Sequence, residues 1–360
     1  MQNINLESPF GFTPLPSQNE NMQIDPVQKF QFHGTASEYF GIWIVNILLT
    51  IITIGFYAPW AKVRRLRYFY GNTELIERRF DFTGIPSRIL IGRLIAIGIY
   101  IGIAILSKYS VTIAVLGGLF IYAVIPWLVC ATLRFRGRNS KFGNSRFYFS
   151  GTTKRAYLEF FKGLLITICT LGLFFPVLIW LFKRYYFNHL YIGQLKFNLR
   201  ADWPVYMGAV YVPFLAFLGL LSCLGLISFL MSDFIPRLGI ENVMIIAFVF
   251  YVTSLFIIWP WMFARIFIAT WKNITLSESC FQTSCREWRY TWIIFSNWIV
   301  KIMSIGLMTP WAEIRLYKYQ VESLSLQLNN DPDTMFNRLQ NNPIGVAEEI
   351  ADVFDFDISL

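Results

Sequence analysis

Seven long apolar stretches constrain the fold of this chain more than any other feature. They run at about 39–61, 89–106, 111–133, 163–182, 205–231, 243–271 and 290–312. A helix needs about 20 mainly apolar residues to cross the hydrocarbon core of a bilayer. Only 15% of the residues are charged, against about 25% in soluble domains. The sequence therefore predicts an all-α polytopic membrane protein with short strand-like linkers between its membrane segments.

The charges divide unevenly along the chain. Residues 1–320 carry a net charge of +16 and residues 321–360 a net charge of −7, which together give the overall +9. The basic residues gather at the ends of the apolar stretches, as cytoplasmic flanks beside anionic phospholipid do. We therefore expect membrane phospholipids as partners, no nucleic acid, and an acidic cytoplasmic tail that could bind a protein partner.

A motif of fixed spacing repeats through the chain. Pro59–Trp60 is followed by Asn72, twelve residues after the Trp, and then by Phe80. Gapless echoes of this motif begin at Pro126–Trp127, at Pro260–Trp261, in degenerate form at Pro176–Val177, and in truncated form at Pro310–Trp311. Linkers such as Phe147-x-Phe149-x-Gly151 alternate with period two. They predict short strands outside the bilayer, because open sheet edges cannot face lipid.

Larger offsets predict the domain organisation. A shift of 134 residues carries Pro126 onto Pro260, and a shift of 117 residues carries Gly34 onto Gly151. We expect a disordered lead, a first membrane segment with its strand linker, two internal repeat units of three membrane segments each, and the acidic tail. Their ranges are 1–28, 29–87, 88–204, 205–323 and 324–360.

The first copy of the motif carries further characteristic residues. They are Phe32-x-Gly34, Glu38–Tyr39–Phe40, Trp43-x-x-Asn46, and the run TIGFYAPW from Thr53 to Trp60, followed by Lys62 and Arg64. Over roughly residues 29–325 the chain resembles the YjgN family of bacterial inner-membrane proteins. The resemblance implies a multi-pass protein of the bacterial inner membrane. The function of this family is unknown, so the resemblance supplies no catalytic residues. The copy at Pro176 departs from the pattern, with Val177 and Gly163 where Trp and Asn are expected.

Two topologies fit the stretches 39–61, 163–182 and 290–312. If each stretch crosses the membrane, the two units face opposite ways, as in many transporters. If each is re-entrant, with turns near Gly55, Gly172 and Gly306, then 28 basic residues lie on one side and two on the other. The positive-inside rule favours this second arrangement. Against it, 163–182 has the length of a full span, and a re-entrant turn needs partners for its backbone groups.

The Pro-Trp pairs and nearby basic residues predict contacts at the membrane border. Trp prefers the headgroup interface, and Pro marks a kink or a helix boundary. The interfacial residues are Pro59, Trp60, Pro126, Trp127, Pro260, Trp261, Pro310 and Trp311. The candidate ligands of lipid headgroups are Lys62, Arg64, Arg65, Arg67, Arg134 and Arg136. The Asn twelve residues after the Trp is expected to cap or turn the linker.

One cation lies in the middle of an apolar stretch. It is Lys301, with Asn297 one turn before it. An ionisable residue at membrane depth is a candidate functional site, although a lysine can also snorkel to an interface. Asn46 matches Asn297 at an offset of 251 residues, which predicts interhelical hydrogen bonds more than ligand binding. These three residues form the candidate intramembrane polar site.

Signatures of catalysis are missing from the sequence. His33 and His189 have no Cys, Asp or Glu at the spacing of metal ligands. G-x-S-x-G, P-loop and H-E-x-x-H motifs do not occur. The border carboxylates Glu38, Glu159 and Asp202 are interpreted as ordinary pairs with nearby Arg or Lys. We therefore expect no enzyme activity, no metal and no cofactor.

Two classes of function follow from these patterns. Internal duplication favours transport or translocation of a small molecule or lipid, near Asn46, Asn297 and Lys301. The alternative is a non-catalytic membrane scaffold or phospholipid-binding protein that acts through its basic-aromatic cytoplasmic face. The two are distinguished by whether the linkers lie on both sides of the membrane or on one.

Overall fold

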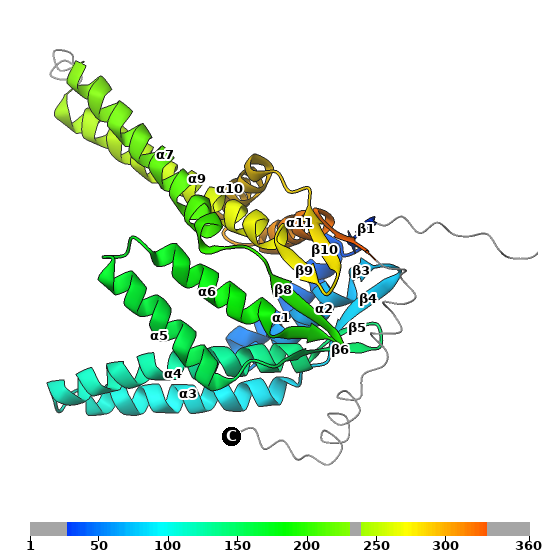
Figure 1. The fold of residues 1–360 in the computed structure, drawn as a ribbon. Helices are drawn as coiled ribbons and strands as arrows, with labels where there is room; N and C mark the ends of the chain where they lie inside the picture. The colour runs from blue at the N-terminus through cyan, green and yellow to red at the C-terminus, as the bar shows by residue number, and fades with distance from the viewer. Residues whose placement is uncertain (1–26, 231–238, 330–360) are drawn as a thin grey trace, which may run out of the picture.

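The computed structural model describes residues 27–230 and 239–329. Within these residues, five pairs of helices alternate with short strands (Figure 1). The helix pairs are α1 (Ala36–Ile52) with α2 (Ala58–Gly71), α3 (Pro86–Leu106) with α4 (Val111–Arg138), α5 (Thr153–Cys169) with α6 (Phe175–Asn188), α7 (Trp203–Leu230) with α9 (Ile240–Trp271), and α10 (Glu287–Met303) with α11 (Thr309–Glu322). The strands are β1 (Val27–Lys29), β2 (Gln31–Phe32), β3 (Thr73–Leu75), β4 (Arg78–Phe82), β5 (Ser140–Phe142), β6 (Ser145–Phe149), β7 (Leu190–Ile192), β8 (Leu195–Leu199), β9 (Ile274–Leu276), β10 (Ser279–Thr283) and β11 (Leu324–Gln327).

These strands correct the prediction of an all-α fold, because they join into one closed antiparallel sheet. The order along the sheet is β1-β11-β10-β9-β8-β7-β6-β5-β4-β3-β2. Its two edge strands, β1 and β2, are consecutive in the chain and are separated only by Phe30, whose amide donates to the Leu324 carbonyl (3.2 Å). The edges are thus joined through the chain itself, and the sheet forms a barrel without the free edge that can template aggregation.

The barrel takes in both ends of the described chain. β1 begins inside the lead that was predicted to be disordered, and β11 lies inside the predicted tail. The two strands pair in register, with Val27 opposite Gln327. Residues 324–327 therefore belong to the sheet and not to a tail. The rest of the predicted lead, and the acidic remainder of the predicted tail from residue 330, lie outside the described residues.

Five phenylalanines form a ring of side chains around the middle of the barrel. Neighbouring ring centroids lie 6.1–6.4 Å apart around a complete circle formed by Phe30, Phe80, Phe147, Phe197 and Phe281. Their backbones belong to alternate strands, which lie about 9.5 Å apart, so the rings converge on the barrel axis. Neighbouring ring planes differ by only 19–26°. If the ring planes stood parallel to the barrel axis, neighbouring planes would differ by a fifth of a full turn. The small observed angles mean that the ring planes lie nearly perpendicular to the axis.

The Phe-x-Gly spacing follows from close packing where a strand meets its helix. A Cβ atom added to Gly34, Gly84 or Gly151 would lie 2.4–2.5 Å from the ring of the phenylalanine two residues earlier. In the two remaining copies a smaller, non-aromatic residue replaces the phenylalanine, and a residue with a side chain replaces the glycine. These pairs are Leu199 with Ala201 and Thr283 with Cys285. A large ring at the first position therefore goes with glycine at the second, and a smaller side chain at the first goes with a larger residue at the second.

The Asn twelve residues after the Trp caps its helix, as its spacing predicts. Asn72 ends α2, and its side-chain amide donates to the Tyr68 carbonyl (2.9 Å). Asn139 does the same for Phe135 at the end of α4 (2.7 Å). The Asn72 carbonyl in turn accepts from the His33 amide at the end of β2 (2.9 Å). Each such cap therefore links one repeat to its neighbour.

Three helix pairs turn back inside an apolar stretch. α1–α2, α5–α6 and α10–α11 break at Gly55, Gly172 and Gly306, where φ is 85–87°. The stretches 39–61, 163–182 and 290–312 are therefore helical hairpins and not single helices. Among the described residues, the helices long and apolar enough to cross a membrane are α3, α4, α7 and α9.

The helix pairs also pack against one another in sequence around the barrel. α2 contacts α3, α4 contacts α5, α6 contacts α7, α9 contacts α10, and α11 contacts α1. The long pairs α3–α4 and α7–α9 extend from the sheet and diverge (Figure 1). Every pair starts and ends at the same sheet, so the repeats are related by rotation about the barrel and not by inversion. The predicted units 88–204 and 205–323 each hold two of these pairs.

We expect Gly84→Ala to destabilise the fold, because its methyl group would overlap the Phe82 ring. Overpacking of this kind costs about 1–3 kcal/mol, which a lowered midpoint of thermal unfolding in detergent would report. Gly98→Ala is the matched control, since a Cβ there meets nothing within 4 Å. Adding Phe82→Leu to Gly84→Ala copies the Leu199/Ala201 pair and should restore stability. A double variant less stable than Gly84→Ala would contradict the compensation.

The four β-hairpin turns should share one side of the membrane. Single cysteines at Glu77, Asn144, Gln194 and Glu278, in a cysteine-free background, should resist an impermeant thiol reagent in intact cells and react after permeabilisation. The reason is that one closed sheet cannot lie on both sides of a bilayer, and 28 basic residues place this side inside. Lys108→Cys, between α3 and α4, should react in intact cells. Labelling of only some of the four turns would refute the shared side.

Candidate functional site

The tips of the three short hairpins present apolar side chains to the surroundings. Ile54, Leu171 and Ile305 are 90–95% exposed. All three stand at positive φ directly before the turn glycine. A conformation that displays an isoleucine or leucine so fully is favourable only where the surroundings are apolar. The tips therefore suit the hydrocarbon region of a bilayer, as a re-entrant arrangement requires.

Each tip also pairs its own backbone amides. In the first hairpin, the amides of residues 53–58 all donate within the turn, including Gly55 to the Thr50 carbonyl (2.7 Å) and Tyr57 to the Thr53 hydroxyl (3.0 Å). The same acceptors recur in the same order for residues 170–175 and 304–309. Unpaired amides in hydrocarbon would cost several kcal/mol each. The sequence-level objection to a re-entrant turn is thereby answered.

The Pro-Trp pairs divide into a buried and an exposed half. Pro59 and Pro310 open α2 and α11, where a proline costs no hydrogen bond. Pro126 and Pro260 lie inside the long helices α4 and α9. All four prolines are buried. Exposed tryptophans follow three of them, namely Trp60, Trp127 and Trp311. Exposed indoles at helix surfaces suit the predicted interfacial position.

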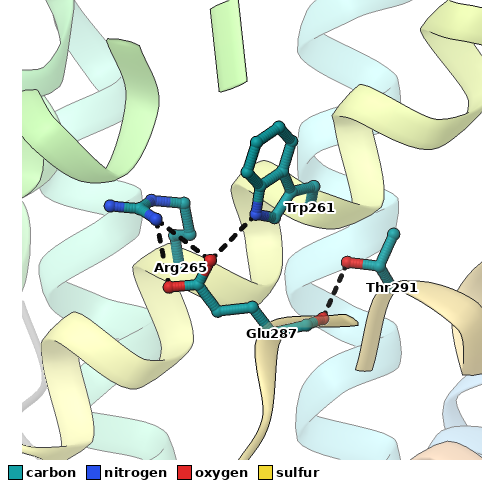
Figure 2. A network of polar contacts seen from close by, with 4 residues as sticks. All are labelled: Trp261, Arg265, Glu287 and Thr291. Carbon is teal, nitrogen blue, oxygen red and sulfur yellow. Dashed lines mark hydrogen bonds and ion pairs between the residues drawn. The ribbon is translucent and has the colours of Figure 1, made fainter. Parts of the chain in front are cut away.

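Trp261 is the exception, because its indole is engaged within the protein (Figure 2). The indole N–H donates to a carboxylate oxygen of Glu287 (2.9 Å), and Arg265 Nη1 donates to both oxygens of the same carboxylate (3.0 Å). Thr291 donates its hydroxyl to the Glu287 carbonyl (2.8 Å). This network fastens α9 to α10. Sequence reasoning missed Glu287 and Arg265, although Arg265 lies within an apolar stretch one turn after Trp261.

The six predicted headgroup residues fall into two groups, and three of them are engaged in holding the fold. Arg67 donates to the carbonyls of Phe82 (3.1 Å) and Gly84 (3.4 Å), and Arg134 donates to the Gly151 carbonyl (2.9 Å). These contacts fasten a second helix to the end of the following strand. Arg65 forms an ion pair with Glu313 (3.3 Å).

The other three cations are exposed and have no hydrogen-bond or ion-pair partner among the residues that the structure describes. They are Lys62, Arg64 and Arg136. Partial desolvation lowers the pKa of Lys62, and the nearby Arg136 lowers it further. Lys62 of α2 and Arg136 of α4 thus repel one another, and no acid among the described residues pairs with either. An anion placed between them would relieve this repulsion.

The three candidate intramembrane residues are not linked to one another by side-chain hydrogen bonds in the described chain. Asn297 is buried between α10 and α11, where its amide donates to the Ala312 carbonyl (2.8 Å) and its oxygen accepts from Arg315 (3.2 Å). Asn46 is buried on α1, and its side-chain oxygen has no partner. Lys301 lies in the last turn of α10, beside the exposed tip. Within the described chain, no hydrogen bond or ion pair joins Asn46 to either of the other two.

The border carboxylates also differ from one another. Glu38 accepts a hydrogen bond from the Tyr68 hydroxyl (3.0 Å). Glu159 and Asp202 form no ion pair within residues 27–230 and 239–329. Neither of these two carboxylates therefore forms, within the described residues, the boundary ion pair that the sequence predicts.

Comparison with known proteins establishes the family. Residues 27–353 match the family described as "Bacterial protein of unknown function (DUF898)". The chain belongs to this family. It is 32% identical over 147 residues to the inner membrane protein YjgN of Escherichia coli O157:H7 and to that of Escherichia coli strain K12. It is 33% identical over 132 residues to the protein of the same name from Salmonella typhimurium. No solved structure matches the chain significantly.

These matches cover 40%, 40% and 36% of this chain and 36%, 36% and 33% of the relatives, so the chain matches about a third of the length of each curated relative. The family membership and the relatives' names confirm the resemblance to the YjgN family. Together with the four helices long enough to span a bilayer, they identify a bacterial inner-membrane protein.

The two groups of arginines should respond differently to truncation. Arg134→Ala removes a charge-assisted hydrogen bond to the Gly151 carbonyl, and should lower the free energy of unfolding by about 1–2 kcal/mol. Arg136→Ala, two residues along α4, should leave the midpoint of thermal unfolding in detergent unchanged. Equal losses of stability in both variants would show that Arg136 is also held by the fold.

Proposed function

We propose that the protein is a non-catalytic phospholipid-binding protein of the inner membrane, which holds anionic headgroups at the sheet side of the bilayer. The observation that carries the proposal is the free state of Lys62, Arg64 and Arg136. Arginines beside them are tied to carbonyls or to Glu313. These three cations are therefore available to a ligand outside the fold.

Their position along the helices supports a lipid ligand. Lys62 and Arg136 lie about 15 and 5 Å from the caps that join α2 and α4 to the sheet, at 1.5 Å per residue. The exposed Trp60 and Trp127 lie farther out, about 18 Å from the same caps, and the apolar tip at Ile54 lies beyond them. Going away from the sheet, basic residues come first, then tryptophans, then the apolar tips. This is the order expected for side chains that run from the headgroup region into the hydrocarbon core.

Transport loses its main argument in this arrangement. The expectation rested on units of opposite orientation, whereas all linkers join one sheet and repeat the same cap contacts. One continuous sheet-side face, with free cations from two of the repeats on it, supports phospholipid binding ahead of transport.

The proposal is tested by measuring bound lipid. In nanodiscs that mix phosphatidylglycerol with phosphatidylcholine, the wild-type protein should enrich phosphatidylglycerol, and native mass spectrometry would count the retained molecules. Replacing Lys62, Arg64 and Arg136 together by Gln should reduce this enrichment. Each residue removes about 1 kcal/mol of attraction near the surface, or about fivefold in affinity.

The control variant is Lys108→Gln, which removes one exposed cation from the turn between α3 and α4, far from the sheet. It should leave the enrichment unchanged. The proposal fails if the triple variant retains the preference of the wild-type protein for phosphatidylglycerol.

A further inference from the structure

The network in Figure 2 shows what a Pro-Trp motif binds when an arginine follows it by one helical turn. Trp261 and Arg265 are four residues apart on α9, so their side chains share one face of the helix. The indole N–H of Trp261 and Nη1 of Arg265 donate to the two carboxylate oxygens of Glu287 at 2.9–3.0 Å. The pair is thus a site for an oxyanion, and here a carboxylate of the protein itself fills it.

The same pair occurs on α2 without the carboxylate. Trp60 and Arg64 have the spacing of the pair on α9, and they lie equally far before the Asn that caps their helix. The position of Glu287, 26 residues after the Trp, is taken by Pro86, which begins α3 as Glu287 begins α10. Trp60 and Arg64 are both exposed, and the side chain of neither has a hydrogen-bond or ion-pair partner among the described residues.

A buried asparagine marks the same place from the neighbouring helix. In the hairpin α10–α11, Arg315 donates to the side-chain oxygen of Asn297 (3.2 Å), 18 residues earlier, and lies over the Trp311 ring (5.1 Å). Asn46 and Arg64 have the same separation in the hairpin α1–α2, whose turn repeats the same backbone hydrogen bonds. Yet the side-chain oxygen of Asn46 is buried without a donor, which is costly. A guanidinium has five N–H donors, so Arg64 can satisfy Asn46 and an anion together.

The open pair also lies at the level of the headgroups. Three of the four Pro-Trp motifs have an arginine four residues after the Trp. Two of these arginines are engaged within the protein, by Glu287 and by Asn297. Arg64 is the third, and it lies about 12 Å along α2 from the cap at the sheet. A phosphodiester offers two unesterified oxygens that share one negative charge, as a carboxylate does, and arginine binds both groups through them.

We propose that Trp60 and Arg64 bind the phosphate of an anionic phospholipid as the pair on α9 binds the carboxylate of Glu287, with Asn46 positioning the Arg64 guanidinium. Lys62 lies between the two residues on α2, which disfavours a headgroup that carries a cation of its own. This inference rests on the proposed phospholipid-binding function. It adds a defined site, in which directed hydrogen bonds from an indole and a guanidinium hold the phosphate, whereas the proposed function requires only positive charge.

Variants that keep every charge test the site. Phosphatidylglycerol retained by the full-length protein from mixed nanodiscs is counted by native mass spectrometry. Trp60→Phe removes only the indole N–H, and should lower the affinity about fivefold because a hydrogen bond to a charged group is lost. Arg64→Lys keeps the charge but not the planar guanidinium, and should lower it about threefold. The matched control is Trp127→Phe on α4, where Ala131 stands in place of the arginine. It should change nothing, and an equal loss in this control would overturn the site.

A carboxylate added to the chain should close the site. Pro86→Glu places on α3 the group that α10 carries at Glu287. It should reduce retained phosphatidylglycerol to the level of Arg64→Gln and raise the midpoint of thermal unfolding, which a folding defect would lower instead. Retention equal to that of the wild-type protein would overturn the equivalence of the two pairs.

The positioning role of Asn46 is tested by a double-mutant cycle with Arg64. Asn46→Leu should lower the affinity about threefold in the wild-type background and leave it unchanged in the Arg64→Gln background, because it acts through Arg64. A loss of equal size in both backgrounds would show that Asn46 only supports the fold, and would overturn this part of the inference.

Two further comparisons separate the possible outcomes. Inorganic phosphate, titrated in nanodiscs of phosphatidylcholine alone, should not bind in a way that depends on Trp60. Such binding, with phosphatidylglycerol counts unchanged by Trp60→Phe, would overturn the lipid as the ligand. Loss of enrichment in the triple Gln variant of Lys62, Arg64 and Arg136, without loss in Trp60→Phe and Pro86→Glu, would overturn this site alone. Enrichment that survives the triple variant would overturn the proposed function and this site with it.

Discussion

Closure of the sheet is the constraint on which the rest of the structure depends. Because β1 and β2 are joined through Phe30, each helix pair must leave the barrel and return to it. A chain that returns to the same side crosses the bilayer twice or turns within it. The long pairs α3–α4 and α7–α9 are long enough for the first, and the glycine turns of the three short pairs suit the second. Topology is therefore set by the barrel and not by hydropathy alone.

Packing at the barrel explains why the repeats keep some residues and change others. Each repeat adds one ring to the phenylalanine layer, so that position is aromatic in all five copies. Two residues along, the ring and the glycine form a pair, because a Cβ at the glycine would overlap the ring. Where the sequence has Leu199 in place of the phenylalanine, it has Ala201 in place of the glycine. The departures from phenylalanine and from glycine thus occur together in the same repeat.

Local patterns predicted the parts that local physics decides. The spacing from Pro-Trp to Asn72 predicted the helix cap, and period two predicted β4 and β6. Closure was not predictable in this way, because β1 and β11 are separated by almost the whole described chain. Hydropathy also merged α1 with α2, since the turn at Ile54 is as apolar as the helices. Of the candidate site, the residue types were predicted, but which cations are free depended on distant carbonyls such as Gly151.

The unpaired charges of the described helices lie between the hairpin tips and the barrel. The three tips pair their own amides, and Ile54, Leu171 and Ile305 at their turns are almost fully exposed. Phenylalanine rings line the barrel lumen. Unpaired charge remains between these two regions, where Lys62, Arg136 and Glu159 lie within about 15 Å of the sheet along their helices. Since an unpaired charge is costly away from water, these side chains must lie at a level that water or headgroups reach, which supports the proposed binding of phospholipid.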